Sequence, residues 1–245
     1  MLRLERNSEH PVLVDPDTLT PGSLIEPDDE ELRHLKARRA VAGDEVRLFD
    51  GRGNIAAGHL AERSRRLVIS VESVTAVPAP PRFVLCVGAG DKERFGWLAE
   101  KSAELGVTEL IPLETTRAMS VATRLRPQHL DALRRRARQA IKQSGAAWAP
   151  EIVEPSSLEA AAGPAPESEL RLLAHVDGGL APDISLNTPV VVVVGPEGGL
   201  TDDEREYLTA RGFAAVRLAR DLLRFETAAL AAAALVASQR TRSTR

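Results

Sequence analysis

The stretch "VVVVVGPEGGLTDDE", Val190–Glu204, decides the fold of the C-terminal part of the chain. Five consecutive valines predict a strand that is buried on both faces, as in a parallel sheet. Thr201 with Glu204 three residues later is a capping-box pattern, which predicts that a helix begins there. The stretch therefore predicts a buried strand, a tight glycine turn and a capped helix.

Alternating segments on both sides of this stretch extend the pattern. Other apolar runs of strand length are Phe83–Val87, Thr108–Leu113, Leu170–Val176 and Ala214–Leu218. Amphipathic helices are predicted over 91–106 and 127–145, and an alanine-rich helix over 226–239. Buried strands that alternate with helices are typical of a parallel sheet covered on both faces, so the fold class is α/β.

The N-terminal part follows a different pattern. Polar and apolar side chains alternate in residues 44–60 and 65–74, and Asp50–Gly53 is a turn signal. The pattern of residues 27–41 predicts one short helix. These features predict a small β-rich domain. The proline-rich stretch "VPAPPRF", Val77–Phe83, predicts an extended linker. We therefore expect two domains, 1–76 and 77–245.

Composition excludes several classes of protein. No apolar run reaches the roughly 18–20 residues that a membrane-spanning helix needs, and the first residues hold no apolar signal core. The single cysteine, Cys86, lies in an apolar run, as expected of a buried thiol in a reducing compartment. The five histidines show no metal-ligand spacing. We expect a cytoplasmic protein with no metal and no membrane contact.

Positive charge is concentrated in one segment. The net charge of the chain is −3, yet 117–142 holds eight arginine and lysine residues and one carboxylate, Asp131. Such a band most simply contacts phosphates, and a solvated helix face is the alternative.

The glycine turn at Gly195 does not match the usual phosphate-binding loops. It lacks the lysine of GxxxxGK[ST] and the spacing of GxGxxG, and Glu197 at its centre disfavours an anion. Arg224 and Glu226 follow another predicted strand. Loops at the carboxyl ends of strands are where α/β proteins bind ligands. The same residues also fit a plain turn and a surface ion pair.

Two motifs carry a family resemblance. "GPEGGLTDDE" followed by "LARDLLRFETAAL" resembles the SPOUT superfamily of methyltransferases, and more narrowly the family that methylates N3 of a uridine in bacterial 16S ribosomal RNA. The stretches 97–118 and 134–145 resemble that family's middle region, and 32–53 resembles its PUA-like N-terminal barrel. The resemblance implies an α/β trefoil-knot domain with a parallel sheet, preceded by a small PUA-like β-barrel.

The resemblance also implies a cofactor and its binding residues. S-adenosyl-L-methionine would bind in a bent form among three loops, and the protein would be a homodimer that acts on 16S rRNA within the small ribosomal subunit. The residues implied for the cofactor are Leu173, Ala174, His175, Gly195, Pro196, Glu197, Gly198, Gly199, Leu218, Ala219, Leu222 and Leu223.

The implied catalytic residues are Arg224 and Glu226. Arg224 would stabilise the anion that forms when uracil N3 loses its proton. Glu226 would orient Arg224 or accept the proton, and Glu197 would contact the substrate or the partner subunit. The residues expected to bind RNA are Arg33, Arg38, Arg39, Arg117, Arg124, Arg134, Arg138 and Lys142.

Three positions depart from the family's usual pattern. Ala219 and Phe225 stand where glycine and threonine are common, and Ala146 stands where an arginine is usual. Besides a uracil-N3 methyltransferase, the sequence therefore leaves two hypotheses open. One is a SPOUT enzyme that acts on another RNA position, and the other is a non-catalytic RNA-binding or assembly factor.

Overall fold

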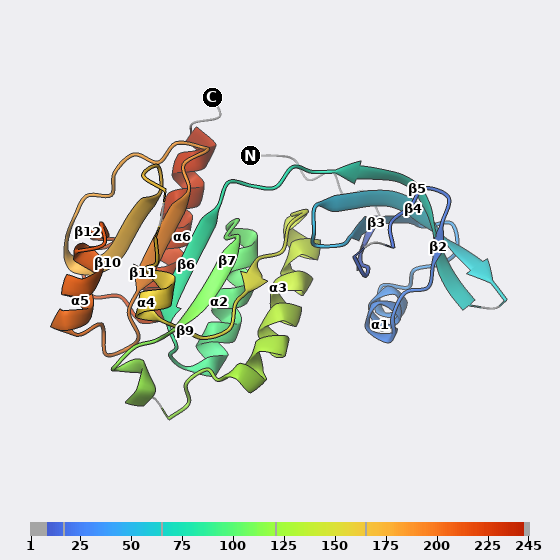
Figure 1. The fold of residues 1–245 in the computed structure, drawn as a ribbon. Coiled ribbons are helices and arrows are strands. Elements are labelled where there is room, and N and C mark those ends of the chain that lie inside the picture. Colours follow the sequence, from blue (N-terminus) through green and yellow to red (C-terminus); the bar gives the residue numbers. More distant parts are fainter. Residues whose placement is uncertain (1–8, 17, 65, 121, 165, 243–245) are drawn as a thin grey trace. The chain divides into compact units, whose positions relative to one another are not determined.

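The computed structural model describes residues 9–242 except 17, 65, 121 and 165. The chain forms two compact units. The first unit consists of two segments, the chain up to Ala79 and Ile141–Ala149. The second consists of Pro80–Ala140 and the chain from Pro150 onward. Figure 1 labels most of the helices and strands of the two units.

The first unit is built on a five-stranded sheet with the order β1-β3-β4-β5-β2. Its strands are β1 (His10–Leu13), β2 (Leu24–Ile25), β3 (Glu45–Phe49), β4 (Asn54–Arg63) and β5 (Arg66–Ala76), and α1 spans Asp29–Ala37. The pairs of β4 with β3 and β5 are antiparallel. Buried Asp50 fixes the predicted turn, because its carboxylate accepts the backbone N–H groups of Arg52 and Asn54. The β-rich prediction for this region is confirmed.

The second unit contains a seven-stranded sheet in which every pair is parallel. The strand order is β12-β10-β11-β6-β7-β8, and β9 also pairs with β7. The strands are β6 (Phe83–Gly88), β7 (Glu109–Glu114), β8 (Glu151–Ile152), β9 (Ser156–Ser157), β10 (Leu170–Gly179), β11 (Val190–Val194) and β12 (Ala214–Val216). All five valines of β11 are buried, as the sequence predicts for a central strand.

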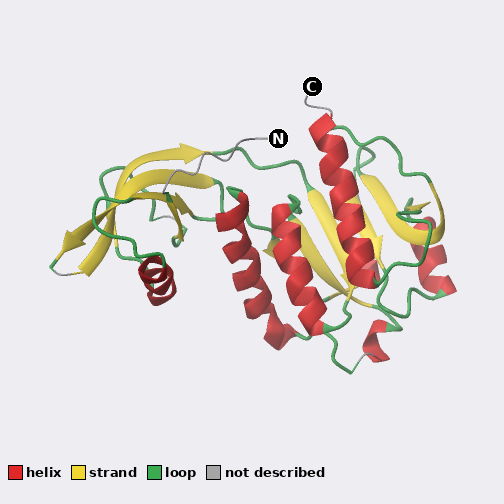
Figure 2. Ribbon diagram, turned by 180° about the vertical axis from the view of Figure 1, so that it is seen from behind, coloured by secondary structure: helices red, strands yellow, loops and turns green. Residues whose placement is uncertain are grey.

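Helices cover both faces of this parallel sheet. Figure 2 shows α2 (Lys92–Glu104), α3 (Leu130–Ser144) and α6 (Phe225–Arg242) on one face. The other face carries α4 (Leu158–Ala161) and α5 (Asp202–Thr209). Two short 3₁₀ turns, η1 (Ala118–Ser120) and η2 (Pro127–His129), lie between β7 and α3. The predicted α/β arrangement is confirmed.

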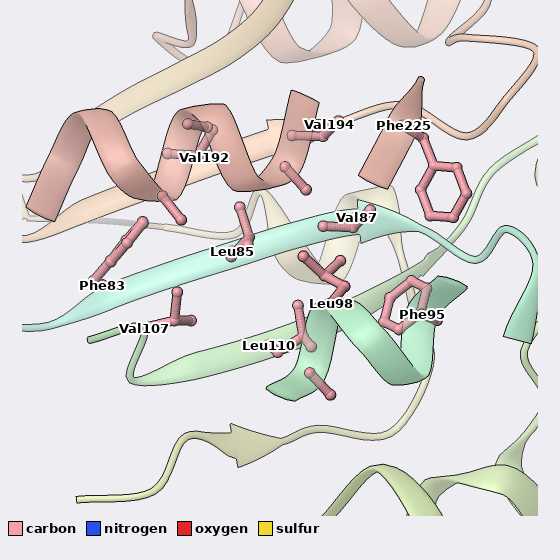
Figure 3. Close-up of a cluster of buried hydrophobic side chains, with 14 of the residues drawn as sticks. Phe83, Leu85, Val87, Phe95, Leu98, Val107, Leu110, Val192, Val194 and Phe225 are labelled. Atoms are coloured by element: carbon pink, nitrogen blue, oxygen red, sulfur yellow. The ribbon is translucent and has the colours of Figure 1, made fainter. Parts of the chain in front are cut away.

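Alternate residues of the central strands face the two helix layers. Leu85 and Val87 of β6 pack with Phe95 and Leu98 of α2 and with Phe225 of α6 (Figure 3). Cys86 points to the opposite layer, where burial raises the pKa of its thiol to about 12. Such a thiol stays protonated and unreactive near neutral pH, in agreement with the structural role expected for this cysteine.

The helix start predicted at Thr201 is confirmed. The Thr201 hydroxyl accepts the Glu204 N–H at 3.3 Å, and Glu204 Oε2 accepts the Thr201 N–H at 2.8 Å. The strand predicted over Ala214–Leu218 ends earlier, at Val216. β12 is an edge strand and its pairing with β10 is irregular, so the two residues beyond Val216 belong to a loop.

Candidate active site

A cavity of ≈ 320 Å³ lies at the carboxyl ends of β11 and β12 and beside the middle of β10. Three segments line most of it: Leu173–Val176 of β10, the turn after β11 and the loop between β12 and α6. A cavity of this size is at the lower end of the range for small-molecule sites. Ligands of α/β proteins bind at this edge of the sheet, so the cavity is the candidate site.

The cavity brings together most of the residues predicted to bind a cofactor. Those that line it are Leu173, Ala174, His175, Gly195, Pro196, Glu197, Gly199, Leu218, Ala219, Leu222 and Leu223. Gly198 is not among the lining residues, and its carbonyl oxygen accepts a hydrogen bond from Arg117 Nη1 at 2.5 Å. The three loops named from the sequence therefore converge on one cavity.

The turn after β11 depends on two glycines. Gly199 has a φ of 71°, a left-handed conformation that glycine adopts without strain, and its N–H donates to Pro196 O at 2.8 Å. Gly88, at the end of β6, packs directly on the backbone of Pro196, where a Cβ atom would overlap the proline nitrogen. The turn is therefore closed by its own hydrogen bond and supported from the neighbouring strand.

Glu197 at the centre of the turn has a defined partner. Its Oε1 accepts the backbone N–H of Asp91, the residue that caps α2, at 3.0 Å. Glu197 also lines the cavity. The carboxylate thus joins the turn to the start of α2.

The segment after β7 closes another side of the cavity. The Thr116 N–H donates to Glu204 Oε1 at 2.7 Å, and Arg117 itself lines the cavity. Burial alone would raise the pKa of the Glu204 carboxyl, but hydrogen bonds from Thr116 and Thr201 outweigh it and hold that pKa below its usual value. Glu204 is therefore an anionic link between α5 and this segment.

Charges of both signs surround the apolar part of the cavity. The cations are Arg117, Arg205 and Arg217, and the carboxylates are Glu197, Asp202 and Asp221. Arg205 pairs with Asp202 and lowers the pKa of that carboxyl, and Arg205 Nη1 lies 3.1 Å from His175 Nε2. The lining suits a ligand that carries both positive and negative groups better than a polyphosphate.

The two predicted catalytic residues have different surroundings. Arg224 is exposed, directly before α6, and within the described part of the chain its side chain has no hydrogen bond or ion pair. Glu226 is buried, with 9% of its surface exposed, and its Oε1 accepts Arg94 Nη1 at 3.0 Å. Glu226 is therefore paired with Arg94, and the side chain of Arg224 is available to a substrate.

Arg94 is the main site residue that sequence reasoning missed. It lies 132 residues from Glu226 in the chain, and no local pattern links the two positions. Arg117, which the basic band of the sequence predicts to bind RNA, lies in the wall of the cavity. Only the spatial arrangement of the loops shows these contacts.

The other residues predicted to bind RNA fall into two groups. Arg33, Arg38 and Arg39 are exposed on and just after α1. Arg134 instead pairs with Asp131 and Glu154, and the hydrogen bonds that its guanidinium donates to Glu154 and then to Asp131 raise its pKa. Lys142 pairs with buried Glu31 at 2.6 Å, and Arg124 donates to Met119 O. Arg138 is half-buried on α3.

The described residues hold neither a candidate metal site nor a candidate membrane-spanning helix. That part of the chain contains no cluster of three or more histidine, cysteine, aspartate or glutamate side chains that could hold a metal ion. None of its helices has the length and apolar character needed to cross a membrane.

Two family models match the chain. Residues 78–237 match the model described as an RNA methyltransferase domain, and residues 27–73 match the model described as an RNA methyltransferase PUA domain. A similar curated protein is the ribosomal RNA small subunit methyltransferase E of Synechocystis sp., 29% identical over 219 residues. That alignment covers 84% of this chain and 70% of the relative.

Solved structures are similar over nearly the whole chain. A ribosomal RNA small subunit methyltransferase E from Neisseria gonorrhoeae, bound to S-adenosyl methionine, has a TM-score of 0.82 and 26% identity. The match covers 95% of this chain and 98% of the chain from Neisseria gonorrhoeae. A methyltransferase of Legionella pneumophila with the same bound cofactor has a TM-score of 0.78, 25% identity, and coverage of 94% and 97%. The predicted fold class is confirmed, and the trefoil knot within it stays a prediction.

Proposed function

The chain belongs to the RNA methyltransferase family whose domain model covers residues 78–237, and we propose that it methylates N3 of a specific uridine in the 16S rRNA of the small ribosomal subunit. This proposal rests on the cavity where the three loops converge and on Arg224 in the adjacent segment, whose side chain has no hydrogen bond or ion pair among the described residues. The names of the relatives support the small subunit as the source of the substrate.

The cavity fits S-adenosylmethionine as methyl donor. Apolar side chains such as Leu173, Leu218 and Leu223 suit the adenine ring, and the mixed charges of the rim suit an amino-acid zwitterion beside a sulfonium. We propose that the cavity-lining residues of the three loops hold the cofactor, with Gly198 supporting the turn. When bound, S-adenosylmethionine supplies an electrophilic methyl group on a positively charged sulfur.

The chain's own contribution to the reaction is electrostatic. Methylation at N3 requires loss of the imide proton, which leaves negative charge on the uracil ring. We propose that the guanidinium of Arg224 lies against the base and stabilises this charge, since fixed cations are most effective where charge develops. We propose that Glu226 orients Arg224, because its ion pair with Arg94 fixes the first turn of α6, which directly follows Arg224.

RNA binding is assigned mainly to exposed cations. We propose that residues 1–76 position the RNA, with Arg33, Arg38 and Arg39 contacting phosphates. Arg124 and Arg138 are proposed to add contacts in the second unit. Arg134 and Lys142 are engaged in ion pairs within the chain and are proposed to contribute less. We propose that the reaction takes place in the cytoplasm, where ribosomal subunits lie.

A second copy of the chain is proposed to cover an apolar surface beside the cavity. Leu180 and Leu222 are 94% and 84% exposed, which is unusual for leucine. A groove lined by Leu180, Leu218, Ala231, Ala234 and Leu235, together with Arg217, Ser238 and Gln239, lies between the loop after β10 and α6. Burial of these side chains in a homodimer would remove them from water.

Label transfer tests the activity. Purified protein, S-adenosylmethionine labelled in the methyl group, and small or large ribosomal subunits from cells lacking this enzyme are incubated, and label in rRNA is counted. We expect incorporation into small-subunit rRNA and none into large-subunit rRNA. Cofactor binding without label in any RNA would instead favour a non-catalytic RNA-binding or assembly factor.

A further inference from the structure

The start of α2 contacts both the turn after β11 and the start of α6. Asp91 caps α2, because its Oδ1 accepts the N–H groups of Glu93 and Arg94 at 3.0 and 3.1 Å. The N–H of the same Asp91 donates to Glu197 in the turn after β11. The start of α2 is therefore fixed to the cofactor side of the proposed site.

Two consecutive residues of α2, Arg94 and Phe95, contact the start of α6. Arg94 Nη1 donates to Glu226 Oε1 at 3.0 Å, and the ring of Phe95 stacks on that of Phe225 with centroids 6.4 Å apart. Figure 3 shows both rings beside Val87 of β6. Phe225 and Glu226 directly follow Arg224, so two consecutive residues of α2 restrain the backbone next to the proposed catalytic cation.

Glu226 depends strongly on Arg94. The Oε2 atom of Glu226 is buried and has no hydrogen-bond partner among the described residues, so the carboxylate is balanced by Arg94 alone through its other oxygen. A buried carboxylate that loses its only cation is costly to keep in place, and the first turn of α6 would shift to expose it.

We propose that Arg94 is a positioning residue for methyl transfer: through Glu226 it holds the start of α6 and thereby aims Arg224 at the substrate base. The inference rests on the proposed function. Arg94 acts on the orientation of another side chain, so it should affect the rate of the chemical step more than the binding of cofactor. A displacement of about 1 Å in a reacting group can lower a rate about 100-fold.

The test compares Arg94→Gln, Arg94→Lys and the control Glu93→Gln. Glu93 lies on the same turn of α2, but its carboxylate is 73% exposed and pairs only loosely with Arg136, at 3.7 Å. We expect Arg94→Gln to lower the single-turnover rate at least ~10-fold while the Kd for S-adenosylmethionine stays within ~3-fold. Arg94→Lys keeps the cation and should recover most of the rate. Glu93→Gln should match the wild type.

Hydrogen exchange gives a readout that does not require turnover. The Ala228 N–H donates to the Arg224 carbonyl oxygen at 2.8 Å, so its exchange reports the junction between Arg224 and α6. Faster exchange there in Arg94→Gln, and not in Glu93→Gln, is expected even if no RNA proves to be a substrate. Unchanged exchange would overturn the inference. Faster exchange with an unchanged turnover rate in an active enzyme would also overturn it.

Discussion

At the scale of single residues, Arg224 is the side chain on which the proposed reaction depends most. Its side chain is exposed and unpaired in the described part of the chain, next to a cavity in which six other charged side chains balance in sign. An arginine without a partner in the protein is free to serve a ligand. We infer that its charge acts on the substrate and contributes little to folding.

Replacement of Arg224 by alanine should therefore separate catalysis from binding. We expect the single-turnover rate to fall by about 100- to 1,000-fold, the usual effect of removing one fixed donor at developing charge. The Kd for cofactor should change less than about twofold. Arg220→Ala, an exposed arginine in the same loop that does not line the cavity, is the control. A rate within threefold of the wild type would remove Arg224 from the mechanism.

Glu204 gives a prediction about pH. The pKa of its carboxyl is lowered in the folded protein, so its contribution to stability is present above the ordinary pKa of 4.5 and is lost as the pH falls through the lower, folded value. Glu204→Gln should thus destabilise the second unit by ~1 kcal/mol at pH 7, as loss of a cap does. The difference from the wild type should shrink below about pH 4.5.

Urea unfolding of the wild type and of Glu204→Gln at pH 7 and pH 4 measures this difference. Glu206→Gln, exposed on the same helix, serves as the control and should be neutral at both pH values. A destabilisation that is equal at the two pH values would show that charge on Glu204 is not what links α5 to Thr116.

At the scale of elements, the turn after β11 relies on its neighbour β6. Gly88→Ala should push Pro196 outward, because the added Cβ would overlap rigid backbone that has little freedom to yield. We expect the Kd for S-adenosylmethionine, measured by calorimetry, to rise at least ~10-fold. Gly179→Ala adds the same methyl group where no atom lies within 4 Å and should leave the Kd unchanged. An equal, small effect of both changes would mean that β6 does not set the turn.

The elements also show how far the sequence can predict this molecule. The valine run, the capping box at Thr201 and the helical periodicities are local patterns, and the corresponding elements form as predicted. The three cofactor loops were placed by resemblance, and they converge on one cavity. These features depend on short segments or on whole motifs, which a single sequence displays directly.

Contacts between distant segments could not be predicted in this way. Arg94 is paired with Glu226, and Lys142 with Glu31. In each pair the two residues are more than 100 positions apart in the sequence. A run of positive charge also does not reveal which cations already have partners. Lys142 and Arg134 lie in the predicted basic band, but both are paired with carboxylates of the chain.

At the scale of the whole molecule, the exposed leucines beside the site predict self-association. Sedimentation equilibrium should give twice the mass of one chain for the wild type and a single-chain mass for Leu180→Asp, which puts a charge into the proposed apolar interface. Leu24→Asp, on an exposed leucine of the first unit, should stay dimeric. A wild-type protein that is monomeric at micromolar concentration would exclude the proposed homodimer.

The identity of the product nucleoside decides whether the molecule methylates N3 of a uridine. Small subunits that lack the modification are incubated with the protein and S-adenosylmethionine, and their rRNA is digested to nucleosides for chromatography with mass detection. We expect one new methylated nucleoside that co-elutes with authentic N3-methyluridine. A product methylated on carbon 5, on the ribose or on another base would rule out N3 of uridine as the methylated atom.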